Sequence, residues 1–417
     1  MNEAEPVSAR MEWRRHWKVV AASMGGTSIG AIPSYMLGLF IHPLEQAFGW
    51  SRAGISSALL IYSIVGVIGA PFAGILVDRL GSRRIALFGA TVYFLFTGLL
   101  SLISSDIHTW WAAWILLGLA GLCTKPTVWS KAVTSFFHKG RGVALAMMAS
   151  GVGIASSVLP IVSNAYIERL GWRWAFVAVA LTFTAIVLPL LWFWFFDSSD
   201  KPTGADTRTK AERLQSLPGW TAREGLRKRQ TYQIAVAAML GTGVVTAFAV
   251  HIISMLTASG VARGEAVGLF GMVGVLAVAS RLIVGVIFDR VEHPAVGVLS
   301  IGLPVIPALA LLFMPPGMEM AIVAVVTLGI AIGGEYDAVI YLGSRFFGLK
   351  AFGFLFGLVA SVMLLGIGLG PVIAGRIYDV YRSYDLFYML VIPASLISSL
   401  LVGTLGRYPD HSAESRA

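Results

Sequence analysis

The chain is short of charged residues and of cysteine. Only 13% of its 417 residues are charged, against roughly 25% in typical soluble domains. Its single cysteine, Cys123, excludes an intramolecular disulfide. The sequence has no Gly-Lys-Ser/Thr phosphate-binding loop and no His and Glu pair at metal-binding spacing. These absences argue against an enzyme, an ATP-driven pump, a bound metal and a cofactor.

Long apolar stretches are abundant instead. Hydrophobic residues make up 57% of the chain, and stretches of about 20 residues, enough to cross a bilayer core, recur about twelve times. The predicted spans are 17–41, 54–77, 85–104, 110–136, 142–166, 174–196, 232–258, 265–288, 295–314, 319–344, 352–377 and 385–405. Barrel strands need only about ten residues and alternate in polarity. The sequence therefore predicts an all-α integral membrane protein with twelve transmembrane helices.

Basic residues predict the orientation in the membrane. With a cytoplasmic amino terminus, 22 of the 31 Lys and Arg residues fall on the cytoplasmic side and 5 on the other, as the positive-inside rule expects. Both termini are then cytoplasmic, and the expected location is a bacterial inner membrane. The formal net charge of +9 is explained by topology, so no nucleic-acid partner is expected. The first span is too long and glycine-rich for a cleavable signal peptide.

An internal repeat organises the chain at a fixed offset of 211 residues. Matched positions include Gly74 with Gly285, Gly118 with Gly329, Pro160 with Pro371, and Glu168 with Asp379. The repeat predicts two pseudo-symmetric six-helix bundles of parallel topology. The predicted parts are a cytoplasmic tail at 1–16, bundles at 17–196 and 231–406, a cytoplasmic linker at 197–230 and a tail at 407–417.

Two loops carry a resemblance to a known family. The segment from Gly74 to Arg84, with sequence Gly-Ile-Leu-Val-Asp-Arg-Leu-Gly-Ser-Arg-Arg, resembles the signature loop of the major facilitator superfamily. A weaker copy, Gly285 to Arg290, follows span 8, where that family has its second copy. The resemblance covers essentially the whole chain and implies the major facilitator fold. It also implies gating roles for Asp78, Arg79, Arg83, Arg84, Asp289 and Arg290.

Within that family the chain is similar to the bacterial branch of monocarboxylate porters and oxalate–formate exchangers. The similarity rests on Phe48 to Arg52, Arg281 in span 8, and Tyr341 to Gly348. The branch uses a span 8 arginine to hold a substrate carboxylate, which implies that role for Arg281. The exchangers also carry a lysine in span 11, and this chain has none there. That difference argues against oxalate exchange and leaves the coupling mode open.

Several ionisable residues lie deep in the predicted spans. Arg281 lies about 12 Å inside the boundary marked by Asp289, and a guanidinium at that depth needs an anionic partner. That anion is either a carboxylate on a neighbouring helix or a substrate. Lys125 is similarly deep, and the repeat matches it to Tyr336, between Glu335 and Asp337.

The two carboxylates lie about 200° apart around one helix, so only one is expected to face a central cleft. We favour Asp337 slightly, because Tyr341 lies one turn further on. Lys125 and one of the carboxylates either form a fixed charge pair, or the pair changes during transport and the carboxyl takes up a proton.

Three further residues are weaker candidates. Tyr35 follows a glycine-rich stretch in span 1 that is expected to bend, so it is either a substrate ligand or a tyrosine hydrogen-bonded within the bundle. Trp129 lies one turn from Lys125 and either covers the apolar part of a substrate or packs the bundle. His251 in span 7 either relays protons or is an interfacial histidine.

Together these features predict a secondary active transporter. We expect it to move a small organic anion, a monocarboxylate or an aromatic acid, by alternating access and as a monomer. Its expected partners are this substrate, protons taken by symport, and the lipid bilayer. Carboxylate exchange and efflux of a drug or metabolite are the alternatives, although a carrier of cations would be expected to place carboxylates, rather than Arg281 and Lys125, in its cleft.

Overall fold

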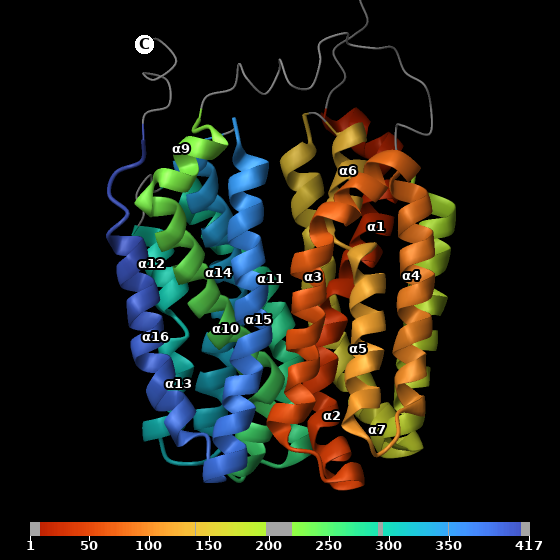
Figure 1. Cartoon of the computed structure of the whole chain (residues 1–417), viewed down its shortest axis with the longest axis vertical. Helices are drawn as coiled ribbons and strands as arrows, with labels where there is room; N and C mark the ends of the chain where they lie inside the picture. The colour runs from red at the N-terminus through yellow and green to blue at the C-terminus, as the bar shows by residue number, and fades with distance from the viewer. Residues whose placement is uncertain (1–8, 138, 197–218, 291–294, 349, 410–417) are drawn as a thin grey trace, which may run out of the picture. The chain divides into compact units, whose positions relative to one another are not determined.

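The structure is a computed structural model, and it describes residues 9–137, 139–196, 219–290, 295–348 and 350–409. Within these ranges every named element is a helix, as Figure 1 shows. The first half contains α1 (Ala9–Ser28), η1 (Ile29–Ala31), α2 (Ile32–Phe48), α3 (Arg52–Leu80), α4 (Ser82–Leu99), η2 (Leu100–Leu102), α5 (Ile107–Leu122), α6 (Pro126–Phe136) and α7 (Arg141–Trp194). The second half contains α9 (Ala222–Arg227), α10 (Arg229–Ala258), α11 (Arg263–Arg290), α12 (Ala295–Gly302), α13 (Val305–Phe313), α14 (Met318–Phe347), α15 (Phe352–Tyr381) and α16 (Asp385–Gly403).

These helices correspond to the twelve predicted spans. Ten described segments are long and apolar enough to cross a membrane. One of them, α7, is two helices joined at Gly171, whose φ of 76° and ψ of 162° interrupt the helical path and suit glycine. A shorter apolar segment, 297–313, contains α12 and α13. With α7 taken as two spans and this segment as one, the predicted all-α membrane architecture is confirmed.

Two spans of the first half are broken near their middle. The first span bends at η1, in the glycine-rich stretch where the sequence predicts a bend. The fourth is split between α5 and α6, where Lys125 has an extended backbone with ψ of 153° and Pro126 begins the next helix. Proline has no N–H and disfavours helical geometry in the residue before it. The local sequence therefore explains this second break.

The chain forms two compact units, and residues 37–67 do not follow the division suggested by the repeat. One unit comprises Met1–Met36 and Ile68–Gly204, and the other comprises Leu37–Val67 and Ala205–Ala417. We call them unit 1 and unit 2. The last part of the first span and the first part of the second thus pack with the C-terminal helices.

In unit 1, small residues allow close helix packing. A Cβ at Gly151 of α7 would collide with the carbonyl oxygen of Met24 in α1, and the Thr27 hydroxyl donates to the carbonyl of Met148 at 2.6 Å. A Cβ at Gly26 would meet the ring of Trp129. In lipid no hydrophobic force draws helices together, so they associate through close packing. The glycines allow that packing here because they let the backbones touch.

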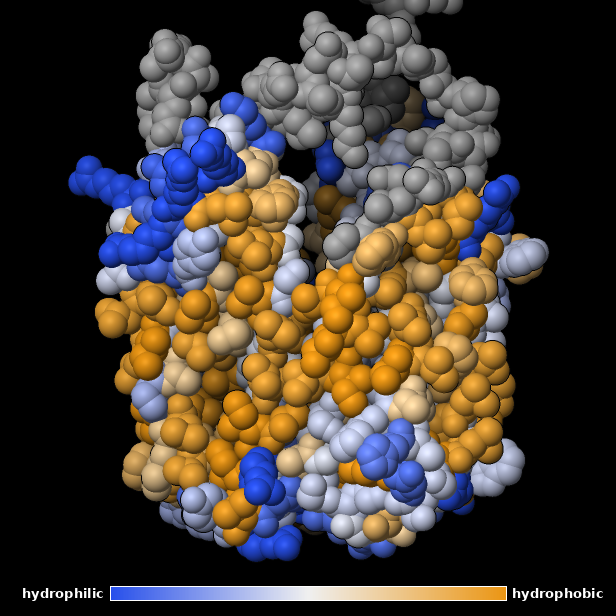
Figure 2. All heavy atoms as spheres, in the orientation of Figure 1, coloured by the Kyte–Doolittle hydropathy of each residue, from blue (hydrophilic) through white to orange (hydrophobic). Residues whose placement is uncertain are grey.

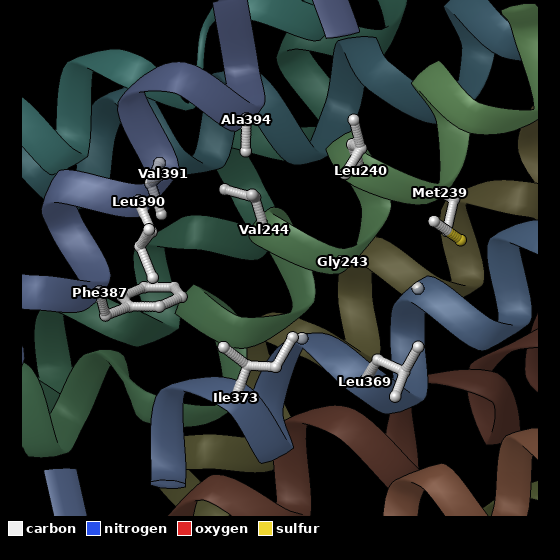
Figure 3. Close-up of a pocket in the computed structure, with 12 residues that line it drawn as sticks. Met239, Leu240, Gly243, Val244, Leu369, Ile373, Phe387, Leu390, Val391 and Ala394 are labelled. Atoms are coloured by element: carbon white, nitrogen blue, oxygen red, sulfur yellow. The ribbon is translucent and has the colours of Figure 1, made fainter. Parts of the chain in front are cut away.

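In unit 2 the same principle joins α10 to α15. A Cβ at Gly366 would collide with the carbonyl of Met239, and one at Gly370 with that of Gly243. Beside this contact, α10, α15 and α16 enclose a pocket of about 240 Å³, shown in Figure 3. The pocket is lined by Met239, Leu240, Gly243, Val244, Gly366, Leu369, Gly370, Ile373, Phe387, Leu390, Val391 and Ala394. None of these side chains is ionisable, so the pocket offers no ligand for a carboxylate.

Large apolar side chains cover the outward faces of the spans. On the surface visible in Figure 2, hydrophobic residues cover the middle turns of the helices and hydrophilic ones gather toward the helix ends. Exposed residues of this kind include Leu282 and Ile283 in α11 and Leu396 and Leu400 in α16. Exposed apolar surface of this extent is what a bilayer covers.

Candidate functional site

The deep arginine of unit 2 is paired with a carboxylate. The Nε of Arg281 in α11 lies 3.0 Å from Oδ2 of Asp337 in α14. Although the distance is short, this Nε makes no well-directed hydrogen bond, so the contact is an ion pair without an aligned N–H. The side chains remain 25% and 27% exposed. The pair therefore neutralises the buried charge while both partners remain partly accessible.

Close packing of α11 on α14 forms this pair. A Cβ at Gly333 would collide with the carbonyl of Ala277, and one at Gly329 would lie 2.6 Å from Cβ of Leu276. The hydroxyl of Ser280 donates to the carbonyl of Ile330 at 2.9 Å. The residue after Ser280 is Arg281, so the glycine contacts set the distance between the two charged residues.

Glu335 occupies a different environment from Asp337, although only Tyr336 separates them. Its side chain is 3% exposed, and Oε1 accepts a 2.7 Å hydrogen bond from the Thr242 hydroxyl of α10. No ion pair to Glu335 is formed by the described residues. Asp337 thus turns toward α11 and Glu335 toward α10. Of the two carboxylates, Asp337 is the more accessible.

Tyr336 lies between these carboxylates and is 41% exposed. It belongs to the same turn of α14 as the ion pair. Its role as a substrate ligand beside Arg281 stays a prediction.

Two of the predicted site residues in unit 1 are Lys125 and Trp129. Lys125 lies at the break between α5 and α6, and Trp129 is buried inside the unit. Lys125 occupies the position just before the first residue of α6 and is half-buried. Trp129 is fully buried, donates its indole N–H to the carbonyl of Thr124 at 3.0 Å and packs edge-on against Phe195. A side chain enclosed in this way packs unit 1, which is the alternative given for Trp129, and contact with a substrate stays a prediction. Tyr35, in α2, is also buried.

His251 lies in a buried polar cluster that sequence reasoning did not assemble. Its Nε2 is 2.9 Å from the carbonyl of Pro371 and 3.2 Å from the Ser56 hydroxyl, and Nδ1 is 3.0 Å from the Tyr384 hydroxyl. A carbonyl only accepts, so Nε2 carries the proton and Nδ1 accepts from Tyr384. Burial raises the pKa of Tyr384 to about 12, which keeps this donor protonated. Both ring nitrogens are therefore engaged in structural contacts, which argues against the predicted proton relay in this conformation.

Arg52 is the charged centre of this cluster. It donates from Nη1 to the Tyr384 hydroxyl at 2.9 Å and from Nη2 to Glu45 at 3.2 Å. Its guanidinium lies 3.6 Å from the ring centroid of Tyr378. The sequence singled out Arg52 only through its family resemblance, and its partners are up to 332 residues away.

Asp379 of α15 caps the N-terminus of α3. Its two carboxylate oxygens accept the backbone N–H groups of Arg52 and Ala53, each at 2.9 Å. A carboxylate at a helix N-terminus satisfies orphan donors and interacts favourably with the helix dipole. The repeat, which matches Asp379 to Glu168, was the only sequence signal at this position.

The predicted gating residues are only partly described. Arg83 donates to the carbonyl of Trp192 at 2.8 Å, and its guanidinium lies 4.0 Å from the ring centroid of Phe196. Arg83 thus binds the end of α7 within unit 1, while Arg84 and Arg290 are exposed. The side chains of Asp78, Arg79 and Asp289 lie outside the described residues. Their gating roles remain predictions.

Comparison with known proteins identifies relatives of this architecture. The model of the Major Facilitator Superfamily matches residues 23–353. An MFS-type transporter of Gibberella moniliformis is 27% identical over 172 residues, which cover 41% of this chain and 40% of that protein. Monocarboxylate transporter 7 of Homo sapiens is 30% identical over 155 residues, 36% of this chain and 29% of that protein. The chain thus spans less than half the length of each of these two relatives.

A solved structure extends the likeness over nearly the whole chain. It is a bacterial homologue of the human lysosomal transporter Spinster, with a TM-score of 0.69 and 18% sequence identity. The match covers 93% of each chain. At this identity the likeness shows the fold alone.

Proposed function

We propose that this chain, which belongs to the Major Facilitator Superfamily, transports a small organic carboxylate. It is a multi-pass membrane transporter rather than an enzyme. The observation that carries the proposal is the partly exposed ion pair of Arg281 with Asp337. The name of the human relative, a monocarboxylate transporter, supports the same substrate class.

Arg281 is suited to exchange its partner. A guanidinium has five N–H donors in a planar fork that fits a carboxylate in bidentate geometry. The ion pair with Asp337 is made at Nε, and no hydrogen bond or ion pair joins this guanidinium to any other of the described residues. A substrate carboxylate can therefore bind the remaining N–H groups in better geometry than Asp337 does. Tyr336, exposed beside the pair, is proposed to contact the substrate.

Glu335 is proposed as the proton carrier. An ionised carboxylate is expensive to bury away from water without a cation, and Glu335 is 3% exposed with a hydroxyl as its hydrogen-bond partner. The protonated form carries a much smaller penalty, so the carrier can change conformation with the proton held on Glu335. One proton on Glu335 balances the negative charge of one substrate carboxylate, so symport moves no net charge.

The remaining features of the proposal come from the sequence. Lys125 is proposed as a second cation of the transport path, because the repeat matches it to Tyr336. The two six-helix bundles are proposed to alternate access to the site, in a monomer located in a bacterial inner membrane with cytoplasmic termini. Carboxylate exchange and efflux are the competing modes.

Uptake into proteoliposomes tests the proposal. The panel is radiolabelled lactate, pyruvate, oxalate, benzoate and hydroxybenzoates, each with and without an inward proton gradient. We expect one acid to accumulate and the gradient to stimulate its uptake. Export of a lipophilic cation without uptake of any acid would support the efflux alternative instead.

Arg281→Lys makes the test specific to the proposed site. It keeps the positive charge and loses the bidentate fork, so we expect uptake to fall roughly tenfold or more, as for a lost charged hydrogen bond. Arg376→Lys, at an exposed arginine of α15, is the matched control and should transport normally. Parental uptake by an inserted Arg281→Lys protein would contradict the assignment.

A further inference from the structure

The cluster around Arg52 joins segments that the repeat assigns to different halves of the chain. Glu45 and Arg52 belong to α2 and α3, whereas His251 belongs to α10 and Asp379 to α15. All of these residues lie in unit 2. In the predicted topology they lie at the ends of the helices away from the cytoplasm. The outer parts of α2 and α3 are therefore bound to helices of the second half.

Glycine contacts support the polar cluster along the same helices. A Cβ at Gly375 would lie 2.8 Å from the backbone nitrogen of Ala53, and one at Gly368 would lie 2.6 Å from Cα of Leu60. A Cβ at Gly38 would collide with the carbonyl of Val250. Backbones of α3 and α15, and of α2 and α10, thus touch without intervening side chains. At these three positions the helices pack too closely to admit a solute.

We propose that the Arg52 cluster is a latch that holds the outer ends of α2 and α3 against α10 and α15 and closes the transport path on that side. The glycine contacts supply the seal, and the polar bonds make it reversible. Every donor and acceptor that the cluster pairs can be paired with water instead when the helices separate at the membrane surface. A contact made only of apolar side chains could not be replaced by bonds to water in this way.

Within the latch, Asp379 has a distinct role from Arg52. Its carboxylate holds two backbone N–H groups of α3, so it binds the helix end whatever side chains that end carries. Arg52 adds directional bonds to Glu45 and Tyr384, and Tyr384 extends the chain to His251. Asp379 holds the backbone of α3, and the side chain of Arg52 holds the same helix end. Removing either the Asp379 carboxylate or the Arg52 guanidinium should therefore weaken the attachment of α3.

Distances between spin labels test the latch. Labels on Ala47→Cys in α2 and Tyr381→Cys in α15, both exposed positions, are placed in a Cys123→Ala chain and measured by pulsed electron resonance in nanodiscs without substrate. The parent should show a short distance. Asp379→Asn and Arg52→Gln should each raise the ratio of long to short distances roughly tenfold, as expected when one charged hydrogen-bond set is lost.

Two further variants keep the test decisive. Asp106→Asn removes another helix-capping aspartate, which accepts from His108 at the start of its own helix, and should leave the distances unchanged. Tyr384→Phe removes one hydroxyl and should shift the distances in the same direction as Arg52→Gln, by less. The latch is refuted if folded Asp379→Asn, Arg52→Gln and Tyr384→Phe chains all keep the parental distances, or if Asp106→Asn shifts them equally. No substrate is present, so failure of the carboxylate proposal would not affect the result.

Discussion

At the scale of single residues, neighbours in sequence have different chemistry because they face different helices. Glu335 and Asp337 are both acidic residues of α14, separated by Tyr336. Asp337 meets a guanidinium at 3.0 Å, while Glu335 meets a hydroxyl at 2.7 Å. The charge on Asp337 is therefore compensated by a cation, whereas no cation among the described residues pairs with Glu335. This contrast is the basis of our proposal that Asp337 gives way to the substrate anion and that Glu335 carries the proton.

Glu335→Gln tests the proton assignment. Glutamine preserves the hydrogen bond to Thr242 and holds the group in a permanently neutral state. We expect proton-driven accumulation to fall roughly tenfold or more, while exchange of labelled for unlabelled substrate across the membrane continues, since exchange requires no net proton release. Both fluxes are measured in the same proteoliposomes.

Glu319→Gln is the control for this substitution. Glu319 lies in the first turn of the same helix and is exposed, so its loss should change neither flux. Gradient-driven accumulation that persists in the Glu335→Gln protein would show that another group carries the proton.

At the scale of elements, glycines decide how closely pairs of helices approach. In unit 2, Gly333 lets α14 approach the backbone of α11 at Ala277, four residues before Arg281. The distance between Arg281 and Asp337 thus depends on Gly333, a residue with no side chain. In lipid such close contacts replace the hydrophobic force that would join helices in water.

Gly333→Ala is expected to destabilise the protein and disturb the site. Its new methyl group would collide with a backbone carbonyl, and overpacking of this kind costs about 1–3 kcal/mol. We expect a lower thermal midpoint in detergent and reduced uptake. Gly268→Ala in α11 is the comparison, because a Cβ there meets nothing within 4 Å, and it should be neutral or stabilising by about 0.5–1 kcal/mol. Equal midpoints for the two variants would contradict the packing argument.

At the scale of the whole molecule, the number of spans fixes the placement of the termini. Twelve spans predict that both ends of the chain lie on one side of the membrane, and the excess of basic residues in the connecting segments predicts that this side is the cytoplasm. The 22-to-5 distribution of Lys and Arg is counted over the entire sequence. This asymmetry does not depend on any contact between helices.

Reporter fusions test this topology. A reporter that is active only in the cytoplasm should be active on the N-terminus, on the C-terminus and within 197–218. It should be inactive when inserted at the connection between α15 and α16, near Arg382. Termini on opposite sides would mean that the number of spans is odd, and α12 and α13 would then be the first segment to reconsider, because their segment is the shortest.

The sequence alone determined the number of spans and their helical type, the repeat, and the family. These properties depend on runs of apolar residues, on short loop motifs and on a fixed offset, all of which are local or periodic. It also marked Arg281 as a charge that needs an anion, because depth in a span follows from counting residues. The break at Lys125 and Pro126 was visible in its residue types, although it was not predicted.

Only the tertiary structure decided which groups meet. The pairing of Arg281 with Asp337 depends on the packing of α11 on α14, and the enclosure of Trp129 depends on its neighbours in unit 1. The cluster that joins Arg52 to Asp379 and Tyr384 brings together residues more than 320 positions apart. Contacts between distant helices depend on where glycines let backbones approach and on which face each side chain takes, and no local pattern in the chain carries that information.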